Sequence, residues 1–138
     1  MSKRKLLVVS LLLVAALLLT GCEAYTEMNS RSSQQQDGSG GKTTVSVGEA
    51  NGTSTKDLET EVSGAILDAI VTLKVGSGSY KIELLDENDQ VTLALEALGG
   101  ETVSGQGLMA ADAFGDASYR VTAVEAEDVE YSIEYTFR

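Results

Sequence analysis

The C-terminal stretch VEYSIEYTF, residues 129–137, decides the fold class. Apolar side chains occupy every second position of it, namely Val129, Tyr131, Ile133, Tyr135 and Phe137. A strand places successive side chains on opposite faces, whereas a helix would scatter this apolar set around its circumference. The stretch therefore predicts a β-strand with one face in a core and the other in water.

The same alternation recurs upstream. It is clear in residues 69–75, 80–84, 91–95 and 119–123, and weaker in residues 44–48, 55–61 and 102–109. The segment GAILDAI, residues 64–70, also fits a short helix and is the main local ambiguity. Repeated short runs of this kind are typical of an all-β domain.

Turn-forming residues separate the runs. Gly76–Gly78 and Gly99–Gly100 supply glycines that accept positive φ, and the polar segments Asp86–Gln90 and Ala113–Asp116 mark further turns. One polar face per strand argues against a parallel sheet, in which both faces are covered. We expect an antiparallel β-sandwich of seven or eight strands over residues 44–138, jelly-roll-like or Ig-like.

One phrase carries a resemblance. The segment GSYKIEL, residues 78–84, with the acidic turn and strand that follow it, resembles small β-sandwich modules of bacterial envelope proteins, including pre-peptidase-type accessory domains. The resemblance implies a fold and no site residues.

The N-terminus has the layout of a secretory signal. Basic residues at positions 3–5 precede an apolar run, residues 6–19, that only Ser10 interrupts. The run is short for a membrane-spanning helix, which needs about 20 apolar residues. We expect a helical signal segment over residues 1–21.

The end of this run is Leu19-Thr20-Gly21-Cys22, which resembles the lipobox of bacterial lipoproteins. The resemblance implies cleavage between Gly21 and Cys22 and a diacylglyceryl group on the Cys22 thiol. Beyond this covalent lipid we expect no cofactor, with calcium left as an open possibility. Two acyl chains hold a protein stably on a bilayer, whereas one does so only marginally. The expected location is a bacterial cell membrane or outer membrane, with the domain outside the cytoplasm.

Residues 22–43 contain the lipid-bearing Cys22 and then a segment rich in Ser, Gln, Gly and charge. Such a segment has little to bury and cannot offset the entropy of ordering itself. The sequence therefore predicts a flexible linker that holds the domain clear of the bilayer.

Composition excludes several function classes. The chain has 10 Lys and Arg against 21 Asp and Glu, for a net charge of −11, so we expect no nucleic-acid partner. It has no His and a single Cys, which removes Ser-His and Cys-His catalysis and the usual zinc sites. We expect a protein that is not an enzyme.

Two binding chemistries stay open. Asp86, Asn88 and Asp89 in the acidic turn are weak candidate calcium ligands, although the spacing fails the EF-hand pattern, and the alternative is a solvated hairpin tip. The tyrosines could form a sugar platform, but they lie on the predicted inward faces and are expected in the core. The sequence favours a membrane-anchored, non-catalytic interaction or structural module, whose partner is an envelope protein or a glycan. The alternative is a module that binds calcium or a glycan through its acidic loops, and the third, disfavoured hypothesis is a small hydrolase that uses paired carboxylates.

Overall fold

The computed structural model describes residues 24–138, and all of its regular elements are β-strands. They are β1 (Thr26–Met28), β2 (Arg31–Gln36), β3 (Gly40–Glu59), β4 (Ile66–Leu85), β5 (Val91–Leu98), β6 (Thr102–Ala110) and β7 (Asp116–Phe137). The predicted signal segment, its cleavage residues Leu19–Gly21 and Cys22 lie outside the described residues. Residues 24–138 hold no helix with the length and apolar character needed to cross a bilayer.

The named strands pair only in antiparallel fashion. The sheet order is β1-β3-β7-β4-β5, with β2 added to β3 and β6 added to β4. β7, the strand that contains the alternating C-terminal stretch, therefore lies at the centre between β3 and β4. The predicted all-β, antiparallel fold is confirmed, and the strand number is seven.

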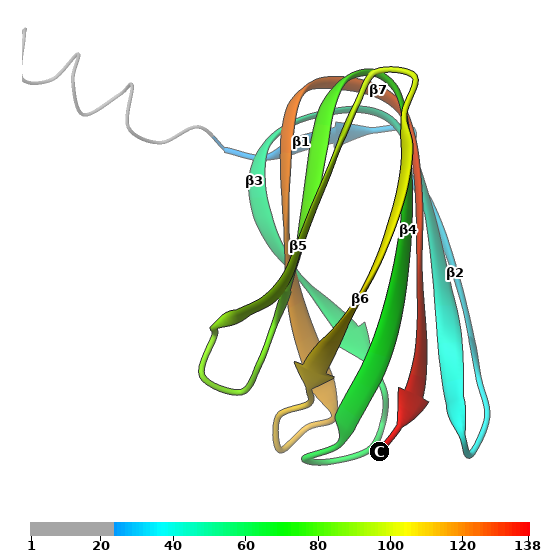
Figure 1. Ribbon diagram of the computed structural model, residues 1–138, viewed down its shortest axis with the longest axis vertical. Helices are drawn as coiled ribbons and strands as arrows, with labels where there is room; N and C mark the ends of the chain where they lie inside the picture. The colour runs from blue at the N-terminus through cyan, green and yellow to red at the C-terminus, as the bar shows by residue number, and fades with distance from the viewer. Residues whose placement is uncertain (1–23) are drawn as a thin grey trace, which may run out of the picture.

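The three long strands each bend near their middle, at the top of Figure 1. The register shifts between Ala50 and Gly52 of β3 and between Ser77 and Ser79 of β4, and β7 turns through positive φ at Glu125. Such bulges bend a strand and increase its twist. Because the bulges lie side by side, the hydrogen-bonded sheet folds over along one line, which we call the bend.

Folding at the bend produces two facing layers. The first layer contains β2, β6 and residues 40–50, 66–77 and 126–137 of the long strands. The second layer contains β5 and residues 52–59, 79–85 and 116–124. The chain is thus a β-sandwich in which β3, β4 and β7 each contribute to both layers.

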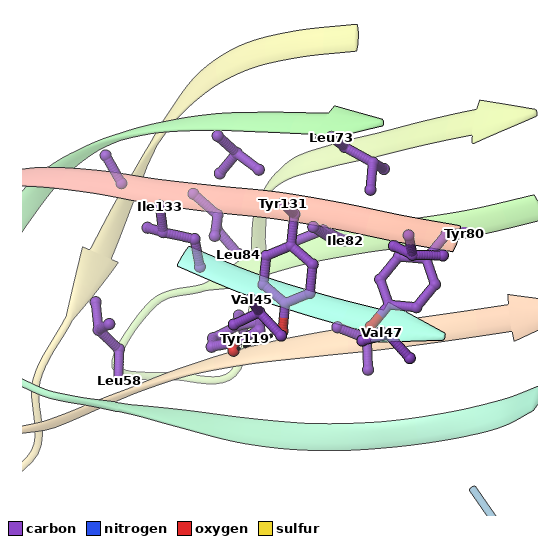
Figure 2. Packing of buried hydrophobic residues seen from close by; sticks show 14 of the residues in the cluster. Val45, Val47, Leu58, Leu73, Tyr80, Ile82, Leu84, Tyr119, Tyr131 and Ile133 are labelled. Atoms are coloured by element: carbon purple, nitrogen blue, oxygen red, sulfur yellow. Dashed lines mark hydrogen bonds between the residues drawn. The ribbon is translucent and has the colours of Figure 1, made fainter. Parts of the chain in front are cut away.

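The core lies between these layers and is built from the alternating positions (Figure 2). Its largest buried side chains include Tyr80, Tyr131, Ile82 and Leu73. The Tyr131 ring of the first layer stacks on the Tyr80 ring of the second, with centroids 5.8 Å apart. The expectation that Tyr80, Tyr119, Tyr131 and Tyr135 belong to the core is confirmed, since all four are buried, while Phe137 is partly buried against them.

The two sides of the sandwich close differently. On one side β5 packs over β6, where Leu93 lies against Gly105 and Gly107; a Cβ on Gly107 would be 2.7 Å from the Leu93 Cβ. On the other side, none of the strands within residues 24–138 closes the gap between the layers. There the side chains of Gln34 and Gln36 reach from β2 to the carbonyls of Glu59 and Thr60.

One local prediction is wrong, and one ambiguity is resolved in favour of a strand. Gly76–Gly78 is not a hairpin turn, because β4 continues through it as the bend. Residues 64–70 form no helix: the segment 66–70 begins β4 and pairs with both β6 and β7. The predicted turns at Asp86–Gln90, Gly99–Gly100 and Ala113–Asp116 do separate strands.

The predicted flexible linker, residues 22–43, is also corrected wherever it is described. Residues 26–28 and 31–36 are β1 and β2, and β3 begins at Gly40. All of these strands pair with β3 or β7. A polar segment is ordered here because the sheet supplies hydrogen-bond partners for its backbone, which its own composition could not reveal.

Candidate functional site

The acidic turn Asp86–Gln90 is a self-capped hairpin tip. The Asp86 Oδ1 atom accepts hydrogen bonds from the backbone N–H groups of Asn88 (2.8 Å) and Gln90 (2.9 Å). Asp89 takes the left-handed conformation, with φ 58°. This is the local backbone capping that Asp and Asn provide in turns. The Asp86 carboxylate is therefore already engaged with its own loop.

The carboxylates of other loops do not join this one. The Asp112 Oδ1 atom likewise accepts the N–H groups of Phe114 (2.8 Å) and Asp116 (3.0 Å) in the turn before β7. Within residues 24–138, no three Asp, Glu, Cys or His side chains are grouped so that they could hold a metal ion. Asp86, Asn88 and Asp89 are thus not grouped with further acidic ligands within the described residues.

The most distinctive polar feature is a cleft on the side of the sandwich that no strand closes. We call it the lateral cleft; it lies between β2 and residues 56–58 of β3, and its volume is about 400 Å³. Its lining residues are Glu27, Ser30, Arg31, Ser32, Gln34, Thr43, Val45, Lys56, Asp57, Leu58, Tyr119 and Tyr131. The cleft therefore reaches from the polar strand edges inward to two core tyrosines.

Those tyrosines meet through their hydroxyl groups. The Tyr119 and Tyr131 oxygens are 2.9 Å apart, and the two rings meet edge to face with centroids 6.0 Å apart. Figure 2 shows the Tyr131 ring with its hydroxyl directed toward the region of Val45 and Tyr119. Only 4% of Tyr119 and 1% of Tyr131 is exposed, and burial raises the pKa of both phenols. The hydroxyl pair is therefore neutral and fixed at the inner end of the cleft.

A second hydroxyl pair lies beside the first. The Tyr25 and Tyr80 oxygens are 3.4 Å apart, and the Tyr25 hydroxyl donates to Glu27 Oε2 at 2.7 Å. Lys56 Nζ donates to the same Glu27 oxygen at 2.9 Å and lies 5.4 Å from the centre of the Tyr25 ring. Glu27 thus accepts the hydrogen bond of the Tyr25 hydroxyl, which itself lies next to that of Tyr80, and it also holds the Lys56 ammonium group at the cleft.

The Glu27 carboxylate has a perturbed acidity. Partial burial by itself would raise its pKa, but hydrogen bonds from Tyr25, Lys56 and Ser30 outweigh burial and hold the pKa below the ordinary value of 4.5. Hydrogen bonding to the charged form of a carboxyl has this effect. The ionised form of Glu27 is therefore stabilised in the folded protein.

This shift predicts an acid-dependent stability. A carboxyl whose pKa is lowered by folding adds stability above its unfolded pKa and loses it as pH falls through the folded pKa. At neutral pH, Glu27→Gln should lower the free energy of unfolding by about 1–2 kcal/mol. The difference in unfolding free energy between wild type and variant should become smaller below pH 4.5, the ordinary pKa of a glutamate carboxyl. Urea denaturation at several pH values measures it, and a gap that is constant with pH would contradict the assignment.

A wider hollow lies at the bend. Its volume is about 820 Å³, and the exposed side chains of Met28, Leu98 and Val124 line it together with Glu49, Glu125 and Glu127. It is larger than the lateral cleft but has no buried polar group among its lining residues. We therefore regard the lateral cleft as the better candidate site.

Sequence reasoning missed the lateral cleft. Glu27, Arg31 and Gln34 belong to the segment that was interpreted as a linker, and Lys56 belongs to a weak strand candidate. The tyrosines were identified correctly as core residues, but alternation does not show that their hydroxyls converge. The one available signal was the excess of Tyr over Phe, five against two.

Comparisons with known proteins place the chain in no family. No family model matches it, and no curated protein matches it in sequence. Among solved structures, it is similar to a subunit of the disulfide-linked pili of Bacillus endospore appendages, at 12% identity and a TM-score of 0.48, over 84% of this chain and 96% of that one. It is also similar to the CBM22-1 xylan-binding domain of Paenibacillus barcinonensis Xyn10C, at 12% identity and a TM-score of 0.40, over 83% and 85%.

A third similar structure is the cupin domain of Schizosaccharomyces pombe Cnp3, at 7% identity and a TM-score of 0.39, over 82% of this chain and 64% of that one. Identities this low concern the fold alone. No function is carried over from these proteins.

Proposed function

We propose that the protein is a bacterial lipoprotein, held on a membrane by a diacylglyceryl group on Cys22, that displays its β-sandwich as a non-catalytic interaction module. The observation that carries this proposal is the segment Leu19-Thr20-Gly21-Cys22 at the end of an apolar run with a basic start. The order and spacing are those of a lipoprotein signal. Two acyl chains on Cys22 would give durable attachment without a further membrane-binding surface.

The first paired residue of the sandwich follows closely after the predicted lipid-bearing Cys22. Ala24 already pairs with Thr53 next to the bend, and β1 starts at Thr26. Only Glu23 separates Cys22 from Ala24. Two residue steps span at most about 7 Å, so the lipid would hold the bend end of the sandwich directly at the bilayer surface. The anchor then sets the orientation of the domain as well as its location.

The composition supports an interaction module more than an enzyme. The chain has no His, and lipidation would consume its only thiol. Its strong acidity opposes binding to nucleic acid, so the partner would be an envelope protein or a glycan. The side of the domain with the lateral cleft stays open to such a partner.

The anchor is tested by Cys22→Ala in a bacterial host. We expect complete loss of fatty-acid labelling and transfer of the protein from the detergent-soluble membrane fraction to the aqueous fraction or to an unprocessed precursor. Thr20→Ser keeps a small residue in the motif and should be labelled and retained like the wild type. Unchanged labelling and membrane retention of the Cys22→Ala protein would refute the proposal.

A further inference from the structure

The lateral cleft is unusual because hydroxyl groups, rather than apolar atoms, form its inner end. The paired hydroxyls of Tyr119 and Tyr131, from the two halves of β7, form that end, and the hydroxyl pair of Tyr25 and Tyr80 lies behind the cleft lining. Elsewhere the core consists mainly of Val, Leu, Ile and Ala. Burying a hydroxyl costs free energy unless a partner is found, so Phe would serve packing alone at lower cost. We infer that the lateral cleft is a binding site for a small neutral saccharide, which names the ligand class of the proposed interaction module.

The charges of the cleft indicate a neutral ligand. Its four charged residues are two acids and two bases: Glu27, Asp57, Arg31 and Lys56. Lys56 and Glu27 already form an ion pair at 2.9 Å. The site is therefore electrically balanced although the whole chain carries a net charge of −11. An ionic ligand would leave an unbalanced charge in a partly desolvated cleft, whereas a neutral one would not.

The hydrogen-bonding groups indicate hydroxyls on that ligand. Tyr25 gives its proton to Glu27, so Tyr80 must be the donor in the Tyr25–Tyr80 pair. In the Tyr119–Tyr131 pair either oxygen can be the donor, so Tyr119 presents the cleft with either a lone pair or a proton. A ligand hydroxyl both donates and accepts and fits either arrangement. A ligand group that only donates, or only accepts, would fit only one of the two directions of the Tyr119–Tyr131 hydrogen bond.

The walls of the cleft are suited to the same chemistry. Ser30, Ser32 and Thr43 offer hydroxyls, and Gln34 offers an amide, which its bond to the Glu59 carbonyl at 2.5 Å holds in place. Val45 and Leu58, which are buried in the core, form the apolar part of the cleft floor. The volume of about 400 Å³ is at the small end of the range for ligand pockets, about 300–1,000 Å³. A mono- or disaccharide is therefore the matching size.

The experiment is a titration of the mature, purified chain in detergent with maltose, cellobiose and diacetylchitobiose in turn. The protein has no Trp and five Tyr, so tyrosine fluorescence reports mainly on the cleft and its neighbours. We expect a saturable change with at least one of the three sugars, with a dissociation constant in the millimolar range, about 1–10 mM. No saturable change with any of them up to about 100 mM would overturn the inference.

Variants locate the binding. Tyr119→Phe removes only the hydroxyl at the inner end and should weaken binding at least about tenfold. The matched control is Tyr135→Phe, the same change at a buried tyrosine outside the cleft lining, and it should bind like the wild type. If Tyr119→Phe does not fold, Arg31→Ala at the exposed mouth replaces it, with weaker binding expected. Equal binding by the wild type and the cleft variants would overturn the assignment of the site.

This inference depends on the proposed module but not on its anchor. Cys22→Ala should leave the sugar titration unchanged, because every lining residue of the cleft is kept in that variant. Loss of anchoring with intact binding would refute the lipoprotein proposal alone. Labelled, membrane-held protein without any sugar response would refute the cleft alone.

Discussion

Gly78→Ala should lower the free energy of unfolding by at least about 3 kcal/mol. Gly78 has a φ of +74°, and an added Cβ would lie 2.1 Å from the Glu125 carbonyl oxygen and 2.6 Å from the Val124 carbonyl oxygen. The left-handed conformation costs an L-residue roughly 1–2 kcal/mol. Both oxygens belong to the β7 backbone at the bend, so relief of the overlap requires β4 and β7 to separate there. Urea denaturation followed by tyrosine fluorescence measures the loss.

A second glycine with a similar φ separates the cost of the left-handed conformation from the cost of steric overlap. Gly64 has a similar φ of +67°, but no atom lies within 4 Å of the Cβ that an alanine would add. Gly64→Ala should therefore cost only the conformational part, roughly 1–2 kcal/mol. Equal losses at the two positions would show that close approach at the bend contributes nothing.

The same glycine shows where sequence reasoning ends. Gly76-Ser77-Gly78 between two alternating runs predicts a hairpin, because a glycine that accepts positive φ serves a turn and a bulge equally well. The segment instead continues as one strand, since both halves of β4 pair with β7 on either side of the bend. Alternation identified the buried positions on both halves correctly. Pairing partners are a non-local property, and that is why two predicted strands became one.

The N-terminal strands failed for a related reason. Residues 31–36 read RSSQQQ and bury no apolar side chain, so composition predicts a linker. They nevertheless pair along their whole length with residues 41–46 of β3. Their order comes from backbone hydrogen bonds and from Gln34 and Gln36, which span the open side of the sandwich. No periodicity of side chains signals a strand of this kind.

For the lateral cleft, some residues were predicted correctly from the sequence and others were not. Tyr119 and Tyr131 were predicted to be core residues from alternation alone, and they are buried. Glu27 and Lys56, which the cleft adds to them, are 29 positions apart. They come together because β1 pairs with β3 at Ala50 and β3 then turns at the bend before Lys56. The acidic turn was the most visible polar cluster in the sequence, yet Asp86 serves its own backbone. Local density of charge was therefore a poor guide, because a site depends on convergence in space.

Tyr131→Ala should lower the free energy of unfolding by about 3–5 kcal/mol. The Tyr131 ring contacts Tyr80 and Tyr119, both in the opposite layer, with centroids 5.8 and 6.0 Å away. Removing it leaves a cavity between the layers and deprives Tyr119 of its hydroxyl partner. A loss of this size is a large part of the roughly 5–15 kcal/mol that stabilises a typical domain.

Two further substitutions divide that loss into its causes. Tyr131→Phe keeps the ring and removes the hydroxyl, so it should cost about 1–2 kcal/mol. Phe114→Ala removes an aromatic ring that is 86% exposed and should change stability by less than about 0.5 kcal/mol. If Tyr131→Phe cost as much as Tyr131→Ala, the hydroxyl network rather than ring packing would hold the layers together. If Tyr131→Ala cost as little as Phe114→Ala, the aromatic contact between the layers would contribute nothing, and the sandwich would depend on its aliphatic residues alone.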